Sequence, residues 1–351
     1  MVDLTKMNRR DLQARAAQLS ERYQAFKAQR LALDMTRGKP CPQQLDLSLG
    51  LLDCLGQSDY RAADGSDCRN YGGLDGLPEA RALFAEFLEV DPSEVIVGGN
   101  SSLAMMHDTI TQAVLRGMPG GTAPWRAQAV KFLCPSPGYD RHFAICQHLG
   151  IDMLTVGMTA SGPDMDEVEG LVAADGSIKG IWCVPKYSNP TGCVYSDATV
   201  RRIARLPQRA GRHFLVMWDN AYAVHDLDDS PPQLANITAM LESEGTESNV
   251  VQFTSTSKIT FAGAGVAFLA SSRDVVKALE GVLGASTIGP DKINQLRHVR
   301  FLEGHLHAHM QRHAALIRPK FGAVLERLEQ SLAGLGVATW THPVGGYFVS
   351  R

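Results

Sequence analysis

Six short apolar runs, separated by longer segments, constrain the fold of this chain more than any other sequence feature. Most of the runs are apolar at successive positions, which is typical of strands that are buried on both faces of a sheet. The runs lie at 94–98, 130–134, 180–184, 214–218, 250–254 and 265–270. Predicted helices between and before them include 78–88, 103–115 and 197–209. This alternation predicts an α/β fold with a mostly parallel, seven-stranded-type sheet between helices.

The two ends of the chain lack the alternation of apolar runs and helical segments that marks its middle. We expect an N-terminal segment at 1–48, a large domain at 49–289 and a smaller domain that begins at 290. The first segment predicts an amphipathic helix over 8–33 and an extended stretch over 36–50. The last segment predicts one long helix over 293–332, followed by strands. Both ends would together build a small α+β domain, and we expect its C-terminal part to be missing after 351.

Composition excludes several classes of function. The formal net charge is −3 and charged residues make up 20% of the chain, with no basic run that could follow a nucleic-acid backbone. No apolar stretch approaches the roughly 20 residues that span a bilayer, and the polar start does not resemble a signal peptide. The seven cysteines are dispersed and form no C-x-x-C pair, which favours reduced thiols. We therefore expect a cytoplasmic protein without nucleic-acid or membrane partners.

Polar motifs follow five of the apolar runs directly. In chain order these motifs are GNSS, PSPGYDRH, PKYSNPTG, DNAY and STSK. In open α/β sheets, ligands bind in the crevice at the carboxyl ends of the strands. Five separate segments are therefore predicted to supply side chains to one site.

The chemistry of these side chains converges on one ligand. Asn100, Ser101 and Ser102 open a predicted helix, where free N–H groups and hydroxyls suit a phosphate. Tyr139 could stack on a flat ring, and Asp219 could keep a ring nitrogen protonated. Asn189 and Tyr222 could hydrogen-bond to a ring oxygen. Lys258 supplies an amine that could form an imine. This combination predicts a site for pyridoxal 5'-phosphate.

In this order, the five motifs resemble the aminotransferase superfamily with the aspartate aminotransferase fold. In detail they are similar to the bacterial aspartate aminotransferase subgroup that is related to the effector domains of transcription regulators. The resemblance implies that Lys258 carries the cofactor and moves the α-proton of the substrate, with Asp219 and Tyr222 as further catalytic residues. It also implies a set of cofactor-binding residues: Asn100, Ser101, Ser102, Tyr139, His142, Asn189, Asp219, Tyr222, Ser255, Lys258 and Tyr71.

The resemblance further implies the reaction and the partners. It favours transfer of an amino group between aspartate and a 2-oxo acid such as 2-oxoglutarate, with Arg37, Gly38 and Asn189 at the substrate. Tyr71 matches a tyrosine that reaches the phosphate of a neighbouring subunit, so a homodimer with shared sites is implied. Two alternatives remain open: another pyridoxal-phosphate reaction (a β-lyase or a decarboxylase), or a truncated inactive or effector-binding relative.

Several other features have a plainer interpretation. Val266 stands where many relatives have an arginine that binds the phosphate, so hydroxyls, a helix end or another cation would balance that charge. The glycines of 263–265 precede a strand, which argues against dinucleotide binding. Cys134 and Cys183 lie in predicted strands and should be buried. No metal site is predicted. A solvated helix face is expected for three histidines, His305, His309 and His313. Two further residues could lie either at the surface or near a partner's site, Lys292 and Arg297.

Overall fold

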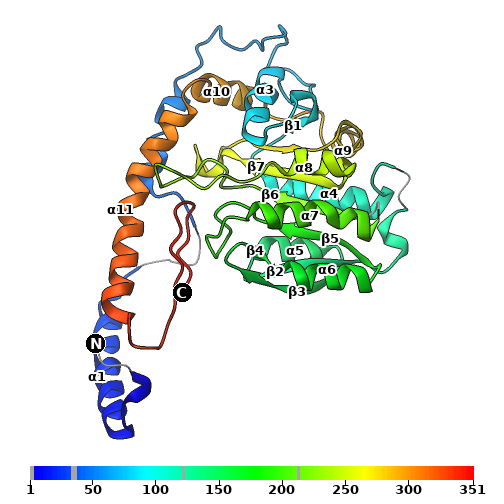
Figure 1. Ribbon diagram of the computed structural model, residues 1–351. Coiled ribbons are helices and arrows are strands. Elements are labelled where there is room, and N and C mark those ends of the chain that lie inside the picture. The colour runs from blue at the N-terminus through cyan, green and yellow to red at the C-terminus, as the bar shows by residue number, and fades with distance from the viewer. Residues whose placement is uncertain (1–3, 33–37, 121–122, 212–213) are drawn as a thin grey trace.

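The computed structural model describes residues 4–32, 38–120, 123–211 and 214–351, and within them a sheet of eight strands forms the centre of the molecule (Figure 1). The strands are β1 Val95–Val97, β2 Lys131–Ser136, β3 Asp152–Thr159, β4 Gly162–Pro163, β5 Ile178–Cys183, β6 Leu215–Asp219, β7 Val250–Ser255 and β8 Ala267–Ala270. Their order is β1-β8-β7-β6-β5-β2-β3-β4. The pairs from β3 through β2, β5 and β6 to β7 are parallel, whereas β8 runs antiparallel to both β7 and β1. The predicted α/β fold with a mostly parallel sheet is confirmed.

The apolar runs did not predict β3 and β4. Most positions of β3 are exposed or half-buried, and Val156 is its buried residue. Since β3 lies next to the short edge strand β4, it has no need of the continuous apolar run that marks the central strands.

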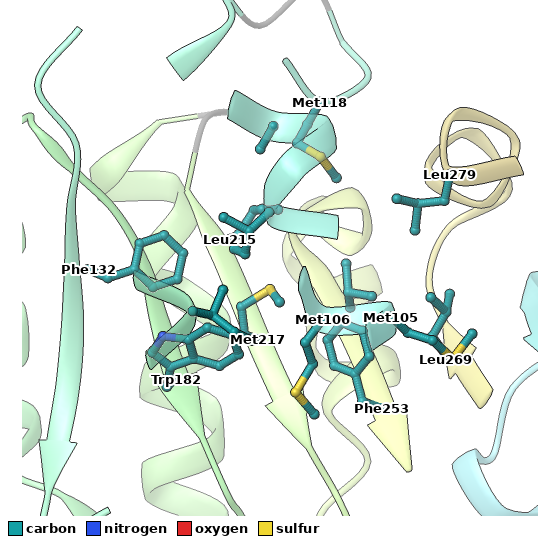
Figure 2. Packing of buried hydrophobic residues seen from close by; sticks show 14 of the residues in the cluster. Met105, Met106, Met118, Phe132, Trp182, Leu215, Met217, Phe253, Leu269 and Leu279 are labelled. Atoms are coloured by element: carbon teal, nitrogen blue, oxygen red, sulfur yellow. The ribbon is translucent and has the colours of Figure 1, made fainter. Parts of the chain in front are cut away.

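Helices cover both faces of the sheet, and the two-residue period of each strand separates two cores. Leu215 and Met217 of β6 pack beneath α4 Ser102–Arg116, α5 Asp140–His148 and α9 Arg273–Ser286 (Figure 2). Val216 and Trp218 point to the other face, under α6 Met165–Ala174, α7 Asp197–Ala210 and α8 Ile237–Glu244. Both faces of the strand are therefore buried, as the apolar runs predict.

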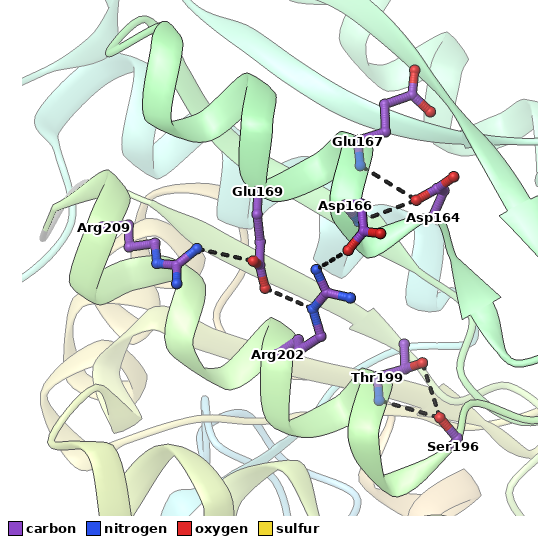
Figure 3. Close-up of polar contacts among 8 residues, drawn as sticks. All are labelled: Asp164, Asp166, Glu167, Glu169, Ser196, Thr199, Arg202 and Arg209. Carbon is purple, nitrogen blue, oxygen red and sulfur yellow. Dashed lines mark hydrogen bonds and ion pairs between the residues drawn. The ribbon is translucent and has the colours of Figure 1, made fainter.

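Charged side chains join α6 to α7 on the outer surface (Figure 3). Arg202 donates from Nε to Glu169 at 2.7 Å and from Nη2 to Asp166 at 2.6 Å, and Arg209 reaches Glu169 at 2.9 Å. Ser196 caps the N-terminus of α7 by accepting from the Thr199 N–H at 3.2 Å. Exposed ion pairs of this kind contribute little to stability, about 0–1 kcal/mol each, so the buried cores dominate.

The chain ends fold differently from the sequence predictions in three places. The stretch predicted to be extended contains α2 Pro42–Asp46 and a 3₁₀ turn at Leu49–Leu52, because Pro42 at the first helical position favours helix. The predicted helix over 293–332 is interrupted at Gly304, which has φ +69° and separates α10 Lys292–Leu302 from α11 Leu306–Leu332. The strands predicted after α11 are absent from the described residues 333–351. Instead, Gly345 forms a single bridge with Asp226, since the segment pairs with an irregular loop and with no strand.

The remaining helices lie around one side of the sheet. α3 Pro78–Leu88 packs with α10 against β1 and β8, whereas α11 extends away from the sheet and α1 Arg9–Ala28 lies near its far end (Figure 1). The C-terminal segment after α11 returns along that helix toward the sheet (Figure 1). Within the described ranges, no helix has both the length and the apolar character that a membrane crossing requires.

Candidate active site

A cavity of about 630 Å³ opens at the edge of the sheet where the parallel strands end. Ten of the predicted site residues line it: Gly38, Asn100, Ser101, Ser102, Tyr139, Asn189, Asp219, Tyr222, Ser255 and Lys258. β1 takes part because it and β7 are both antiparallel to β8 and so end at the same edge. The structure therefore brings all five motifs to one place.

Asp219 is the most deeply buried acidic group of this cavity. It ends β6, and its Oδ2 lies 2.9 Å from Nε2 of His142 on α5. His142 is itself fixed, because its ring stacks on Trp182 at 4.3 Å with an interplanar angle of 9°. The other oxygen, Oδ1, is buried and has no hydrogen-bond partner within the described chain. A buried acceptor without a donor is costly, so this oxygen is suited to an N–H group of a ligand.

Lys258 lies at the end of a 3₁₀ turn, Thr256–Lys258, that directly follows β7. Ser255 caps the turn by accepting from the Ser257 N–H. The Lys258 amine lies 5.0 Å from the centre of the Tyr222 ring. Burial lowers the pKa of this amine, and the nearby Asp219 carboxylate partly opposes the effect. A lowered pKa increases the neutral, nucleophilic fraction of the amine at neutral pH.

The N-terminus of α4 forms another wall of the cavity. Ser101 is the N-cap, and its hydroxyl accepts from the Ala104 N–H at 3.2 Å. The first N–H groups of a helix have no partner within the helix, so with the hydroxyl of Ser102 they can bind an anion. Asn100 is held differently, because its side-chain amide donates to the Gly263 carbonyl at 3.2 Å. It therefore ties the helix start to the loop that follows Lys258.

Val266 lies outside the cavity. Its side chain is buried in the apolar cluster of α3, β8 and α10, and its N–H donates to the Thr256 hydroxyl at 2.9 Å. Gly265 lies close to the same turn, where an added Cβ would come 3.1 Å from the Thr256 hydroxyl. Gly265 thus permits close packing beside the lysine turn, whereas a Cβ at Gly263 would meet no atom of the described residues within 4 Å. The cations that line the cavity are Lys258 and Lys39.

Of the other predicted site residues, His142 contacts Asp219 but does not itself line the cavity. Arg37 lies outside the described residues. The side chain of Tyr71 is at the surface with an exposed fraction of 82% and does not line the cavity of its own chain. Its backbone carbonyl accepts from the Lys292 amine at 3.1 Å. Lys292 is buried, so the surface interpretation of this lysine is wrong.

Sequence reasoning missed the contribution of the C-terminal segment. Phe348 lines the cavity, and a Cβ at Gly38 would lie 2.8 Å from its ring, so the two segments cross closely. Gly345 and Gly346 lie against the Tyr187 ring, where any side chain would collide. The two adjacent glycines followed by two aromatic residues were a signal of close packing, but the residues that they contact lie far away in the sequence.

The histidines of α11 divide into two groups. His305 and His307 are exposed, as expected for a solvated helix face. His309 and His313 are buried instead, with exposed fractions of 5% and 3%, so the prediction of a solvated face is wrong for them. Their face of α11 packs against the turn that carries Lys258, and tertiary contact overrides the polar character of the side chains. Within the described residues, no cluster of three or more metal-binding side chains is present. Cys134 and Cys183 are buried as predicted.

The sheet, the lysine turn, the buried aspartate–histidine pair and the helix end together define a fold-type I aminotransferase scaffold. The sequence model of the family described as aspartate amino-transferase matches residues 7–351. The chain belongs to this family of aminotransferases, whose members typically depend on pyridoxal phosphate.

Individual relatives agree with this assignment. An aspartate aminotransferase of Corynebacterium glutamicum is 45% identical over 95% of this chain and 77% of its own length. A Mycolicibacterium smegmatis protein that carries an aminotransferase assignment is 49% identical over 98% of this chain and 81% of its own length. The crystal structure of an aspartate transaminase from Corynebacterium glutamicum superposes with a TM-score of 0.94 at 43% identity, and the match covers 99% of this chain and 82% of that one.

Proposed function

We propose that this aminotransferase binds pyridoxal 5'-phosphate through Lys258 and moves an amino group between aspartate and a 2-oxo acid such as 2-oxoglutarate. The observation that carries the proposal is the buried, unpartnered Oδ1 of Asp219 in the cavity that Lys258 also lines. A protonated ring nitrogen would supply the donor that this oxygen lacks. When bound, the cofactor supplies an aldehyde that accepts amino groups and a pyridine ring that withdraws electrons.

The residues around the cavity fit the parts of this cofactor. Ser101, Ser102 and Ser255, at the end of α4 and beside the lysine turn, would hold the phosphate. Tyr139 would stack on the ring, and Asn189 and Tyr222 would bind its oxygen substituent. His142 would hold the Asp219 carboxylate in its orientation, because it hydrogen-bonds to the other carboxylate oxygen.

Lys258 would be the residue that attacks the aldehyde and transfers the proton. Because burial lowers the pKa of its amine, more of the amine is neutral and can attack an aldehyde. Once the substrate amine takes its place, the freed Lys258 amine can accept the α-proton of the substrate and return it to another carbon. The Tyr222 ring beside the amine restricts the positions that it can occupy.

The preference for aspartate rests on relatives. The Corynebacterium glutamicum protein named aspartate aminotransferase shares 45% of its aligned residues with this chain. Gly38 and Asn189 line the cavity and could contact the substrate, and we expect Arg37 to act beside them.

Borohydride reduction tests the cofactor assignment. Protein mixed with pyridoxal phosphate should become yellow, and reduction should attach a phosphopyridoxyl group to the peptide that contains Lys258, as determined by mass mapping. Lys186, which also lies near this edge of the sheet but is paired with Asp226 at 2.7 Å, should stay unlabelled. Labelling of Lys186 or of no lysine would refute the assignment.

A half-reaction tests the substrate. Cofactor-loaded protein should convert aspartate to oxaloacetate in a single turnover, and do so faster than it converts aromatic or basic amino acids. Release of pyruvate and ammonia from an amino acid that carries a leaving group on its β-carbon would indicate a β-lyase, and release of carbon dioxide with alanine from aspartate would indicate a decarboxylase. Both results would overturn the proposed reaction but would keep the cofactor site.

A further inference from the structure

Side chains from distant parts of the chain hold the backbone directly after the lysine turn. The Ile259 carbonyl accepts from His309 Nε2 at 2.7 Å and from the Ser48 hydroxyl at 3.4 Å. The carbonyl of Lys258 itself lies 3.4 Å from His225 Nε2 and accepts from the Tyr347 hydroxyl at 3.5 Å. Two consecutive carbonyl groups, one of them belonging to Lys258, are therefore fixed by side-chain donors.

His309 and His313 form a pair beneath the carbonyl of Ile259. They lie one turn apart on α11, and their Nε2 atoms are 3.1 Å apart. The 2.7 Å contact with a carbonyl oxygen requires His309 Nε2 to carry a hydrogen. The ring of His313 also interacts with the Ile259 carbonyl. His309 therefore donates to the Ile259 carbonyl, and the ring of His313 lies directly behind it.

Gln44 fixes the protonation state of the second histidine. Its Oε1 accepts from the Cys41 N–H at 3.0 Å, so its Nε2 must be the donor to His313 Nδ1 at 3.3 Å. Since His313 Nδ1 accepts, a neutral His313 carries its hydrogen on Nε2. The same Gln44 amide donates to the Tyr347 hydroxyl at 2.7 Å. One connected network thus joins α2, α11 and the C-terminal segment to the lysine turn.

Both imidazoles are kept neutral by their surroundings. Burial lowers the pKa of His309 and lowers that of His313 to about 4. Arg312 of α11 and His225 from another segment interact electrostatically with the pair, and the Tyr347 hydroxyl is joined to His313 through Gln44. No carboxylate interacts with the pair among the described residues, and burial outweighs the Ile259 carbonyl, which as a hydrogen-bond acceptor favours the protonated rings.

We propose that His309 and His313 are positioning residues for Lys258. His309, with His313 packed behind it, holds the Ile259 carbonyl and so fixes the point from which the Lys258 amine enters the cavity. This role rests on the proposed use of Lys258 as the cofactor lysine. A reacting group that is displaced by about 1 Å can lose a hundredfold in rate, so a rigid backbone anchor under the lysine has a direct chemical consequence.

Substitutions at position 309 distinguish a hydrogen bond that positions the lysine turn from simple packing of the side chain. His309→Leu removes the donor but keeps an apolar body, whereas His309→Gln keeps an N–H near the place of Nε2. His307→Leu is the matched control, because His307 is exposed on the same helix and contacts Gln311. His313→Leu is a second test of the same network if His309→Leu does not fold, as judged by circular dichroism.

The first readout needs no cofactor. Acetic anhydride labelling of Lys258 across a pH series, quantified by peptide mass mapping, gives the pH at which the amine becomes reactive. Because release of the turn admits water, the midpoint should move to higher pH in His309→Leu, toward that of exposed Lys277. The labelling midpoint should return to the value of the natural chain in His309→Gln and should stay at that value in His307→Leu.

The second readout is the rate at which borohydride traps pyridoxal phosphate on Lys258. We expect it to fall about tenfold to a hundredfold in His309→Leu and to recover in His309→Gln. A folded His309→Leu variant with the labelling midpoint and trapping rate of the natural chain would overturn the proposal. If the natural chain itself is not trapped, the cofactor assignment fails, but the labelling midpoints still decide whether the histidines position this lysine.

Discussion

Asp219 combines a stabilising contact with a destabilising one. His142 satisfies one carboxylate oxygen, while the other is buried without a donor. An unsatisfied buried acceptor typically costs about 1–3 kcal/mol, so the folded chain carries a cost that a ligand with an N–H group can remove. Residues that reduce stability without a ligand and gain a partner on binding are typical of functional sites.

Replacement of this carboxylate should therefore separate stability from function. Asp219→Asn removes the buried charge while keeping the shape, so we expect unchanged or increased resistance to urea in the cofactor-free protein. Amino-group transfer should fall about a hundredfold or more, because the ring nitrogen loses its ionic partner. Asp175→Asn, which removes an exposed pair with Lys131, is the control and should leave activity unchanged. Full activity in Asp219→Asn would contradict the assigned role.

At the scale of elements, two helices begin in the same way but in different surroundings. Ser101 caps α4 at the cavity, and Ser196 caps α7 on the opposite face of the sheet. Each hydroxyl accepts from the N–H three residues later at 3.2 Å. The two caps share this hydrogen bond but differ in their proximity to the proposed phosphate, and the Ser196 hydroxyl also lies 3.0 Å from the Thr199 hydroxyl.

This pair allows a controlled prediction. Ser101→Ala and Ser196→Ala should each lower the free energy of unfolding by about 1 kcal/mol, because each loses one cap hydrogen bond. Only Ser101→Ala should also weaken binding of pyridoxal phosphate, measured by spectroscopic titration. Equal cofactor affinity in the two variants would show that the start of α4 does not hold the phosphate.

At the scale of the molecule, several histidines are buried in and around the lysine turn. Burial lowers the pKa of His225 to about 3 and those of His298 and His313 to about 4, and it also lowers that of His309. In the unfolded chain these rings bind protons below about pH 6.5. The unfolded state therefore binds more protons between about pH 6.5 and 4, and stability falls as the pH falls through this range.

Urea unfolding at pH 7 and pH 5 measures this effect. We expect a loss on the order of 1 kcal/mol or more for each of these histidines at pH 5. His298→Gln should reduce the dependence on pH, since it removes one of the titrating rings whose Nε2 is 2.9 Å from the Thr260 hydroxyl. A stability that is the same at both pH values would show that these imidazoles are not kept neutral by the fold.

We also propose, at the scale of the molecule, that two copies of the chain share an active site. The exposed ring of Tyr71 is not used by its own cavity, and we propose that it completes the phosphate site of a second copy. Lys258→Ala and Tyr71→Ala variants should each be weakly active alone. Refolded together, they should regain activity, because a mixed dimer contains one site with both residues intact. No recovery in a mixture shown to contain mixed dimers would refute the shared site.

The sequence by itself determined the class of fold and most of the predicted site. Apolar runs mark buried strands because burial on both faces demands apolar side chains at successive positions, and this demand is local. The carboxyl ends of such strands meet at one edge, so motifs such as SNPTG and STSK could be assigned to one cavity before any distance was known. Strand β3 was not predicted from the sequence, because most of its side chains face solvent.

Only the tertiary structure decided which residues from the chain ends join the site. Phe348 and Lys39 line the cavity, and His309 and His313 lie buried beneath the lysine turn. No local pattern assigns any of these positions to the site, because its environment is created by segments far away in the sequence. A histidine on a helix is solvated or buried according to what packs against it, and that is a property of the assembled fold.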